Sequence, residues 1–197
     1  MPEAMDLRAE VLEGRFVRLE PYAAHLKDEL RAALNCDADA WSLLGTSGQG
    51  ERFEDWWSSA LDNMASGSWI SFAVRRLSEG RVVGASSYID IRTAHGVVEI
   101  GATFLHPDVR SSMINPEAKQ LMLAHAFEAG AHRVEILTDM RNQRSQAAIA
   151  KLGAVREGVL RRHKVTWTGH IRDTVMFAII DLDWPEVRDR LDARLRT

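Results

Sequence analysis

The sequence has 197 residues, which fits one compact domain, and its 46% hydrophobic and 27% charged residues are typical of a globular protein rather than a disordered or fibrous one. A net charge of −3 gives no general reason for nucleic-acid binding, and no apolar run approaches the ~20 residues of a membrane span. The N-terminal residues lack the apolar core of a signal peptide and the single cysteine, Cys36, excludes an internal disulfide, so we expect a cytoplasmic protein with one domain over residues 1–197.

Periodicity in the first half of the chain predicts an antiparallel sheet with helices packed on it. Apolar residues at spacings of three and four indicate helices, whereas strict alternation indicates strands. Strands that are joined by very short turns must be antiparallel. The expected elements are a strand at 16–19, a helix at 26–34, a mobile loop at 36–50, a helix at 53–64 and strands at 70–74, 81–91 and 97–105.

The second half changes to a strand–helix–strand–helix pattern, which is typical of a parallel unit. Asn115 and Pro116 are suited to the start of a helix, and Gly130 and Gly153 are suited to end two helices. The expected elements are helices at 115–129 and 142–152, a strand at 134–137, a hairpin at 154–166 and 168–180, and a C-terminal helix at about 184–196. Together the two halves predict an α+β domain around one mixed sheet.

The junction between the strand at 97–105 and the following helix is a candidate anion site. The first N–H groups of a helix are unpaired and its dipole is positive at that end, so this position suits a pyrophosphate. Arg110 adds a cation, and Ser111 and Ser112 add hydroxyl donors. The alternative is a plain strand-to-helix loop, because every helix has an N-terminus.

The helix at 142–152 carries a second candidate pair. Asn142 stands at its cap position, and Ser145 shares a stripe with Ala148, Ile149 and Leu152, so the Ser145 hydroxyl is predicted to face the protein. A buried hydroxyl needs a partner. Ser145 either caps the backbone, as serine often does near a helix start, or lines the path of a thioester arm together with Asn142.

Two further features have both a structural and a functional interpretation. Glu99 alternates with Val98, Ile100 and Phe104, so it is predicted on the face opposite the core, either solvated or as a base. The stripe with Trp56 and Trp57 either packs the core or walls an acceptor pocket, to which we also assign Tyr88.

Other constellations are weaker. The seven histidines show no metal-binding spacing, so no metal is expected. Arg161, Arg162, His163 and Lys164 alternate across a strand, which favours a solvated surface over a nucleic-acid site and leaves contact with an acidic acceptor or a phosphate group open.

The run at residues 98–163 resembles the two cofactor motifs of the GNAT superfamily of N-acetyltransferases. The most specific part is Asn142-x-x-Ser145-x-x-Ala148 followed by Lys151-Leu152-Gly153, and the segments 12–21 and 169–180 also resemble the RimJ/RimL branch, the ribosomal-protein N-terminal acetyltransferases. One departure concerns the family pattern Gln/Arg-x-x-Gly-x-Gly, whose matching positions hold Asp108, Ser111 and Met113. Loss of both glycines removes easy access to positive φ.

The resemblance implies a GNAT fold with a seven-stranded sheet splayed between strands 4 and 5 and acetyl-CoA in the opening, used to acetylate a primary amine. Glu99 is the implied base and Ser145 the implied donor to the leaving thiolate. The implied acetyl-CoA contacts are Phe104, Leu105, Arg110, Ser111, Ser112, Met113, Ile114, Asn115, Asn142 and Ser145. The acceptor, a small-molecule or peptide amine, stays open among a protein N-terminus, an amino acid, a polyamine and an antibiotic amine. A homodimer is implied by the resemblance alone, and a non-catalytic acetyl-CoA-binding module is the alternative function.

Overall fold

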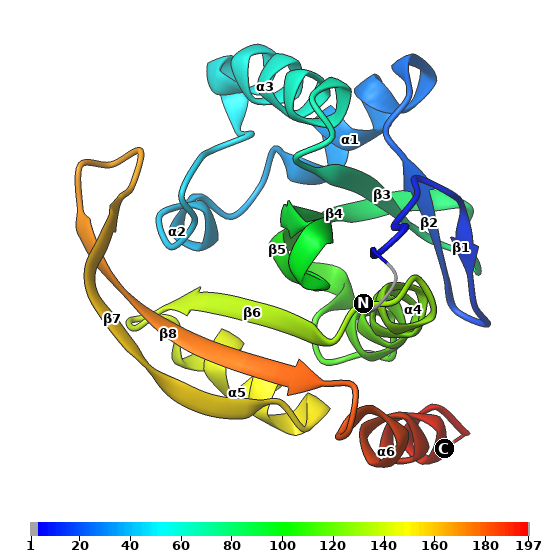
Figure 1. Cartoon of the computed structure of the whole chain (residues 1–197). Helices are drawn as coiled ribbons and strands as arrows, with labels where there is room; N and C mark the ends of the chain where they lie inside the picture. The colour runs from blue at the N-terminus through cyan, green and yellow to red at the C-terminus, as the bar shows by residue number, and fades with distance from the viewer. Residues whose placement is uncertain (1–3, 197) are drawn as a thin grey trace.

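The computed structural model describes residues 4–196, and the strands in that part of the chain form one eight-stranded sheet (Figure 1). Its order is β1-β2-β3-β4-β5-β6-β8-β7, with every neighbouring pair antiparallel except β5 and β6, which are parallel. The strands are β1 Leu12–Glu13, β2 Val17–Pro21, β3 Ile70–Arg76, β4 Arg81–Arg92, β5 Val97–Leu105, β6 Arg133–Asp139, β7 Val155–Val165 and β8 Ile171–Ile180. The predicted mixed sheet is therefore confirmed, while residues 1–3 and 197 of the predicted domain lie outside the described part.

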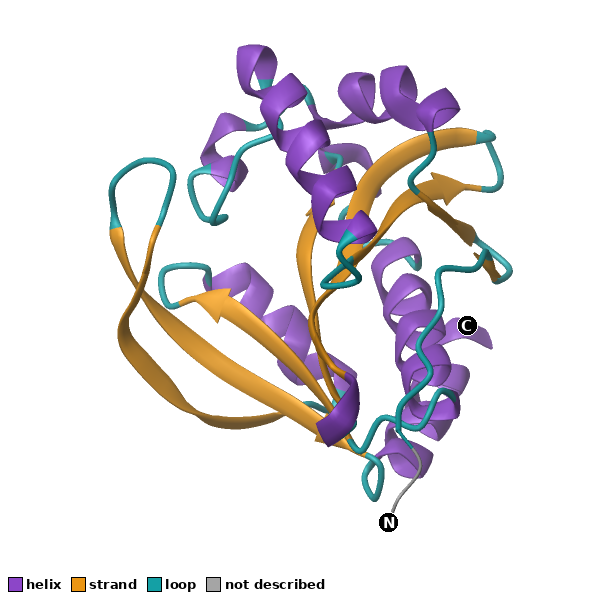
Figure 2. Cartoon of the chain, turned by 45° about the horizontal axis from the view of Figure 1, so that its top comes forward, coloured by secondary structure: helices purple, strands orange, loops and turns teal. Residues whose placement is uncertain are grey.

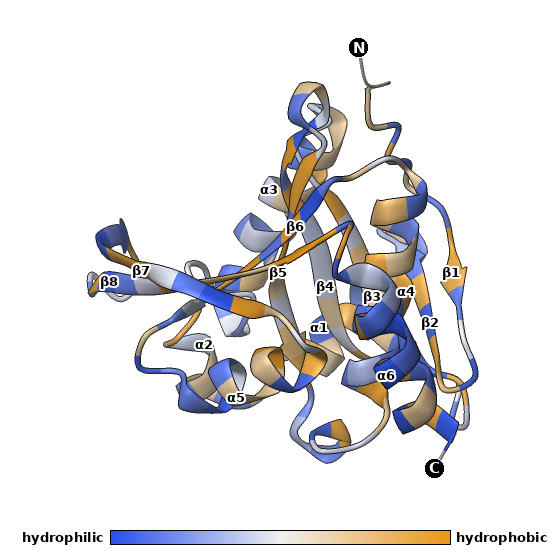
Figure 3. Cartoon of the chain, turned by 60° about the horizontal axis from the view of Figure 1, so that its bottom comes forward, coloured by the Kyte–Doolittle hydropathy of each residue, from blue (hydrophilic) through white to orange (hydrophobic). Residues whose placement is uncertain are grey.

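Helices cover both faces of this sheet, as Figure 2 shows. They are α1 Lys27–Leu34, α2 Ala38–Trp41, α3 Phe53–Ala65, α4 Ile114–Glu128, α5 Gln143–Leu152 and α6 Trp184–Arg196. The first three contribute to one apolar cluster and the last three to another, so the sheet separates two cores. In Figure 3 α6 is mostly blue, because it turns only a few residues, such as Trp184, Val187 and Leu191, toward the core.

Three local predictions were wrong. The expected seven strands are eight, because Leu12–Glu13 adds a two-residue edge strand to β2. The expected loop at 36–50 contains the short helix α2, which Asp37 caps by accepting a hydrogen bond from the Ala40 N–H. Asn115 does not cap α4: the helix begins at Ile114, the preceding Met113 makes no side-chain cap, and Asn115 lies within the first turn.

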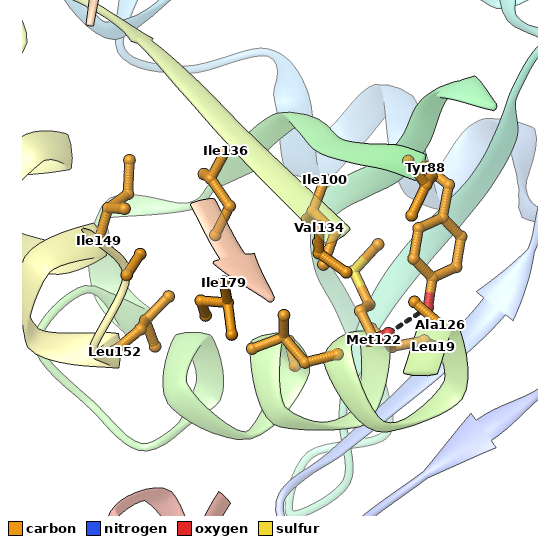
Figure 4. Packing of buried hydrophobic residues seen from close by; sticks show 14 of the residues in the cluster. Leu19, Tyr88, Ile100, Met122, Ala126, Val134, Ile136, Ile149, Leu152 and Ile179 are labelled. Atoms are coloured by element: carbon orange, nitrogen blue, oxygen red, sulfur yellow. Dashed lines mark hydrogen bonds between the residues drawn. The ribbon is translucent and has the colours of Figure 1, made fainter. Parts of the chain in front are cut away.

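The larger core lies between the sheet and helices α4, α5 and α6. Figure 4 shows side chains from these layers meeting there, among them Ile100, Val134, Ile149 and Ile179. Tyr88 extends into the same core, where its hydroxyl donates to the Met122 carbonyl oxygen at 2.5 Å. The polar end of this buried tyrosine is therefore satisfied inside the protein.

One buried carboxylate ties the N-terminal strands to α4. Glu117 accepts hydrogen bonds from the backbone N–H groups of Arg15, Phe16 and Val17 at 2.8, 2.6 and 2.8 Å. A side chain at Gly14 would meet the Glu117 carboxyl carbon at 2.5 Å, so the turn depends on glycine there. The helix that opens the candidate anion site is thus held in place from the other end of the sequence.

The sheet opens between β5 and β6, at the predicted place. These strands pair only at Val97, Val98 and Glu99, after which they diverge. A bulge follows in β5, where Ala102 has φ 48° and the pairing with β4 shifts register. The bulge reverses the alternation, so Phe104 packs in the cluster of α1 and α3, opposite Ile100. The expectation that these two residues share a face was therefore wrong.

Candidate active site

A cavity of about 840 Å³ occupies the opening between β5 and β6. Its walls come from three sources: the diverging strands, the N-terminal turns of α4 and α5, and the aromatic region around α2 and α3. The final hairpin closes one end through Lys164, Val165 and Arg172. Segments that are distant in sequence thus meet around one space, which has a helix-terminus end and a hairpin end.

The loop before α4 adopts a left-handed backbone conformation at one of the two positions where the family pattern has glycine. Ser111, at the position of the first motif glycine, has φ 62°, whereas Met113, at the second, has φ −76° and needs no glycine. A left-handed conformation costs a non-glycine residue roughly 1–2 kcal/mol. Ser111 therefore supplies the loop shape at some expense in stability.

Two polar side chains of this loop, Arg110 and Ser112, already have partners within the chain. Arg110 donates from Nε to the Leu105 carbonyl oxygen at 3.1 Å and forms an ion pair with Asp37. Ser112 Oγ donates to the Val109 carbonyl oxygen at 2.6 Å, which orders the turn into α4. The predicted contacts Phe104, Leu105, Arg110, Ser111, Ser112 and Asn115 all line the cavity.

Two predicted contacts do not line this cavity. Ile114 is buried in the core, and Met113 lines a separate surface pocket together with Phe16 and Leu77. Their side chains therefore pack against the protein, and contact between acetyl-CoA and the backbone N–H groups of Met113 and Ile114 stays a prediction. The sequence pattern placed the loop correctly but could not tell which residues turn inward.

The start of α5 presents both predicted residues to the cavity. Asn142 Oδ1 accepts from the Ser145 N–H at 3.0 Å, so Asn142 is the helix cap as predicted. Ser145 is half-buried, and its hydroxyl has no hydrogen-bond partner among the described residues. The cap role belongs to Asn142, which leaves the Ser145 hydroxyl available to a ligand.

Glu99 lies on the cavity wall at the point where β5 and β6 separate. It is 7% exposed, and within the described part of the chain neither of its carboxyl oxygens has a hydrogen-bond partner. A side chain at Gly101 would meet Glu99 Oε1 at 2.9 Å, so this glycine leaves room for the carboxyl group. Burial raises the pKa of Glu99 to about 7, although Lys164 and Arg172 favour the charged form.

The predicted acceptor aromatics separate into a cavity residue and core residues. Trp56 lines the cavity, together with Trp41, whose ring stacks on Phe104 at 4.5 Å between centroids. Trp57 is buried against Tyr22, and Tyr88 is fully buried on the other side of the sheet. Neither Trp57 nor Tyr88 lines the cavity, so their assignment to the acceptor pocket is corrected to core packing.

Lys119 is a cavity residue that the sequence reasoning missed. It donates to Thr103 Oγ1 at 2.7 Å and to Ser86 Oγ at 3.0 Å, and burial lowers its pKa to about 7. Its position four residues after Asn115 places the two on one face of α4, which is the signal that could have identified it.

Arg172 was also missed as a cavity residue, whereas Lys164, which the sequence left open as a contact for an acidic acceptor or a CoA phosphate, does line the cavity. They face each other across the final hairpin, and burial lowers the pKa of Arg172, although Asp139 and Glu99 favour its charged form. The signal was the alternation of Arg172 and Thr174 with the apolar Ile171, Val175 and Phe177.

Within residues 4–196, no helix has the length and apolar character needed to cross a bilayer. The same residues contain no group of three or more His, Cys, Asp or Glu side chains placed to hold a metal ion.

Comparison with known proteins agrees with this geometry. A domain model described as Acetyltransferase (GNAT) domain matches residues 17–155. No curated protein matches the chain. The crystal structure of a GCN5-related N-acetyltransferase from Brucella melitensis is 31% identical over 98% of this chain and 87% of that one, with a TM-score of 0.88.

Two further structures extend the likeness to the predicted branch. RimJ from Mycobacterium smegmatis, in complex with CoA-disulfide, is 22% identical over 95% of this chain and 96% of that one, with a TM-score of 0.81. The ribosomal-protein-S5-alanine acetyltransferase from Vibrio fischeri is 18% identical over 89% and 98%, with a TM-score of 0.73. At these identities the RimJ/RimL resemblance is confirmed for the fold. The domain match and the Brucella structure go further, and the chain belongs to the GNAT family of acetyltransferases.

Proposed function

We propose that this chain is an acetyl-CoA-dependent N-acetyltransferase that acetylates a primary amine by direct attack in a ternary complex. The observation that carries the proposal is Glu99, a buried carboxylate with a pKa near 7 on the wall of the opening between β5 and β6. A general base works best when its pKa lies near the working pH. A protein that only bound acetyl-CoA would gain nothing from a carboxylate buried at this cost.

The helix-terminus end of the cavity supports binding of acetyl-CoA. Ser112 Oγ accepts from the Ile114 N–H at 3.3 Å, but the N-cap residue Met113 makes no side-chain cap, and a helix N-terminus favours a pyrophosphate. Ser111, Ser112 and Asn115 lie on the same wall, and Asn142 and Ser145 lie beside the path from there toward Glu99. Acetyl-CoA would supply the activated acetyl group, and RimJ, which shares the fold, holds a CoA derivative in its structure.

The cavity residues account for each proton and bond in the transfer. A free α-amino group titrates near pKa ~8, so at neutral pH the ammonium must lose a proton before it attacks. Glu99 accepts that proton, the neutral nitrogen bonds to the acetyl carbon, and the carbon–sulfur bond breaks. The nitrogen then loses a second proton, which the departing thiolate takes up directly or through water, so that the products are the amide and the CoA thiol. A backbone N–H at Phe104 or Leu105 polarises the carbonyl oxygen, and the Ser145 hydroxyl donates a hydrogen bond to the departing thiolate.

The acceptor is a small-molecule or peptide amine. The Vibrio fischeri protein is named as a ribosomal-protein-S5-alanine acetyltransferase, so a protein N-terminus is one candidate beside amino acids, polyamines and antibiotic amines. The wall that would contact it comes from α2, α3 and the final hairpin.

A thermal melt with acetyl-CoA, followed by an amine panel with free-thiol detection, tests the proposal. At one hundred times its dissociation constant a ligand adds about 2.7 kcal/mol, which raises Tm by roughly 5–10 °C for a chain of this size. We expect that shift in the wild type and in Glu99→Gln, with amine-dependent thiol release only in the wild type. No shift at millimolar acetyl-CoA, or a shift without amine-dependent release from any acceptor class, would contradict the proposal.

A further inference from the structure

The hairpin end of the cavity contains a buried arginine whose hydrogen-bonding capacity is largely unused. Arg172 is only 7% exposed and lines the cavity. Its Nε donates to Thr174 Oγ1 at 2.9 Å, but no described residue accepts a hydrogen bond from its two terminal nitrogens. Both terminal nitrogens have access to solvent, and the Arg172 side chain is part of the cavity lining.

Strand register places Arg172 on the same face of the sheet as Glu99. Glu99 pairs with Glu135 of β6, and Asp139, four residues further along β6, pairs with Thr174 of β8. Cross-strand partners and alternate residues of a strand share a face. Arg172 lies two residues from Thr174, just beyond the end of β6, and pairs with Lys164.

The anions on this face already have cationic partners. Asp139 accepts from Arg141 at 2.8, 3.0 and 2.7 Å. Glu135 accepts from Arg92 at 2.5 Å and from Arg133 at 2.8 Å. Neither carboxylate forms an ion pair with Arg172 or, within the described chain, with Lys164. The hairpin end therefore carries positive charge without an ion-pair partner, which Glu99 and the already paired Asp139 offset only through space.

A buried guanidinium without an ionic partner lowers the stability of a fold unless a ligand supplies the anion. The planar guanidinium matches a carboxylate, which can accept two parallel hydrogen bonds from it. Lys164 opposite Arg172 adds a second cation for the same group. An amine that carries a carboxylate would fit this end with its carboxylate at Arg172 and its amine toward Glu99.

We propose that Arg172, assisted by Lys164, binds a carboxylate of the acceptor, so that the acceptor class is an amine bearing a carboxylate group. This inference rests on the proposed acetyltransferase function, because it assigns the acceptor of that reaction. Such a carboxylate can belong to a free amino acid or to an acidic side chain next to a peptide N-terminus.

Matched acceptor pairs test the proposal in the full-length protein with acetyl-CoA. One arm compares free amino acids with their carboxamides, and a second compares peptides with Asp or Asn at the second position. We expect kcat/KM to favour the carboxylate member of at least one pair by about 10- to 100-fold, the range for a hydrogen-bonded charge. The arm in which the preference occurs identifies the source of the carboxylate. Equal use of both members in every pair would overturn the proposal.

Three variants locate the preference. Arg172→Met should abolish it by raising KM for the carboxylate member, and Arg172→Lys should restore part of it. Arg161→Met, on the exposed strand β7 and outside the cavity lining, is the matched control and should keep the full preference. An unchanged preference in Arg172→Met, or a loss of acetyl-CoA affinity in its place, would show that Arg172 does not bind the acceptor.

A binding measurement keeps this inference separate from the proposed function. Calorimetric titration of the same pairs into the CoA complex requires no turnover. If no amine is acetylated but the carboxylate members bind in an Arg172-dependent manner, the proposed function fails and the carboxylate site stands. If an amine is acetylated but no pair shows Arg172-dependent binding or rate, the carboxylate site fails and the function stands.

Discussion

The two ends of the cavity differ in whether their polar groups have partners within the chain. At the helix-terminus end, Arg110, Ser112, Asn142 and Lys119 are held by hydrogen bonds or ion pairs within the chain. At the hairpin end, Glu99 and the terminal nitrogens of Arg172 have no such partners among the described residues. At the helix-terminus end these polar groups are satisfied within the folded chain, whereas at the hairpin end Glu99 and Arg172 are available to a ligand. Substitutions at the two ends should therefore separate stability from chemistry.

The largest expected effect is on turnover in Glu99→Gln. General bases contribute about 10²–10⁴-fold to rate, and the amide cannot accept the proton. In the wild type kcat/KM should rise with pH through about 7 as Glu99 ionises, and the variant should lack that limb. Steady-state kinetics from pH 5.5 to 9 measure both. A variant with wild-type turnover would remove Glu99 from the mechanism.

The same substitution should stabilise the fold, because Glu99 is buried without a partner. Its pKa is raised above the unfolded value, so the folded state binds the proton more tightly, and wild-type stability falls as pH rises from about 4.5 to about 7. The pKa difference corresponds to about 3 kcal/mol. Urea denaturation should show Glu99→Gln more stable than the wild type by up to about 3 kcal/mol at pH 8. The pH-dependent part of that gain should disappear near pH 4.5, and a constant difference would contradict the burial argument.

Ser145→Ala tests whether the free hydroxyl serves the leaving thiolate. Loss of one hydrogen bond corresponds to about 1 kcal/mol, or roughly a 5- to 10-fold fall in kcat. Because this hydroxyl has no partner among the described residues, Tm should not change. A lower Tm with unchanged kcat would make Ser145 a structural residue.

Asn142→Ala tests how much the cap of α5 at the helix-terminus end contributes to stability. Removal of a helix cap typically costs about 1 kcal/mol of unfolding free energy. Asn142→Asp is the matched control, since it keeps the oxygen that accepts from the Ser145 N–H. Chemical denaturation should separate the two variants, and equal stability would show that the cap contributes nothing.

The smallest expected effect is a gain. Ser111→Gly relieves a left-handed conformation, so the free energy of unfolding should rise by about 0.5–1 kcal/mol. Ser112→Gly is the control and should lose stability with its hydrogen bond to Val109. If Ser111→Gly is destabilised in the same melt, the left-handed conformation is not a source of strain.

Local periodicity predicted most of the fold, and long-range pairing determined the rest. The helices at 53–64 and 142–152 were predictable because their apolar spacing spans several turns, whereas β1 and α2 are too short to show a period. The bulge at Ala102 depends on register with β4, which alternation along β5 does not encode. That the chain acts as one domain, is cytoplasmic and forms a homodimer stays a prediction.

The site shows the same division. Glu99, Asn142 and Ser145 followed from alternation, capping and the family resemblance, and they reach the cavity. Alternation along β8 puts Arg172 on the same face as Thr174, but only the pairing of β6 with β8, two strands that are distant in sequence, shows that this face lines the cavity beyond the end of β6. Trp56 and Trp57 are neighbours in sequence, yet only tertiary packing decides which of them reaches the cavity.

The Glu117 carboxylate makes the N-terminal arm a tether for the acetyl-CoA end of the cavity. A chain trimmed only at its N-terminus, to begin at Val17 where the family match begins, would lose two of the three N–H donors to this buried carboxyl group. Glu117 lies in the first turn of α4, where the pyrophosphate is expected, so the loss of these hydrogen bonds would act directly on that turn. Removal of residues that do not line the cavity should therefore weaken acetyl-CoA binding, because those residues hold the first turn of α4 in place.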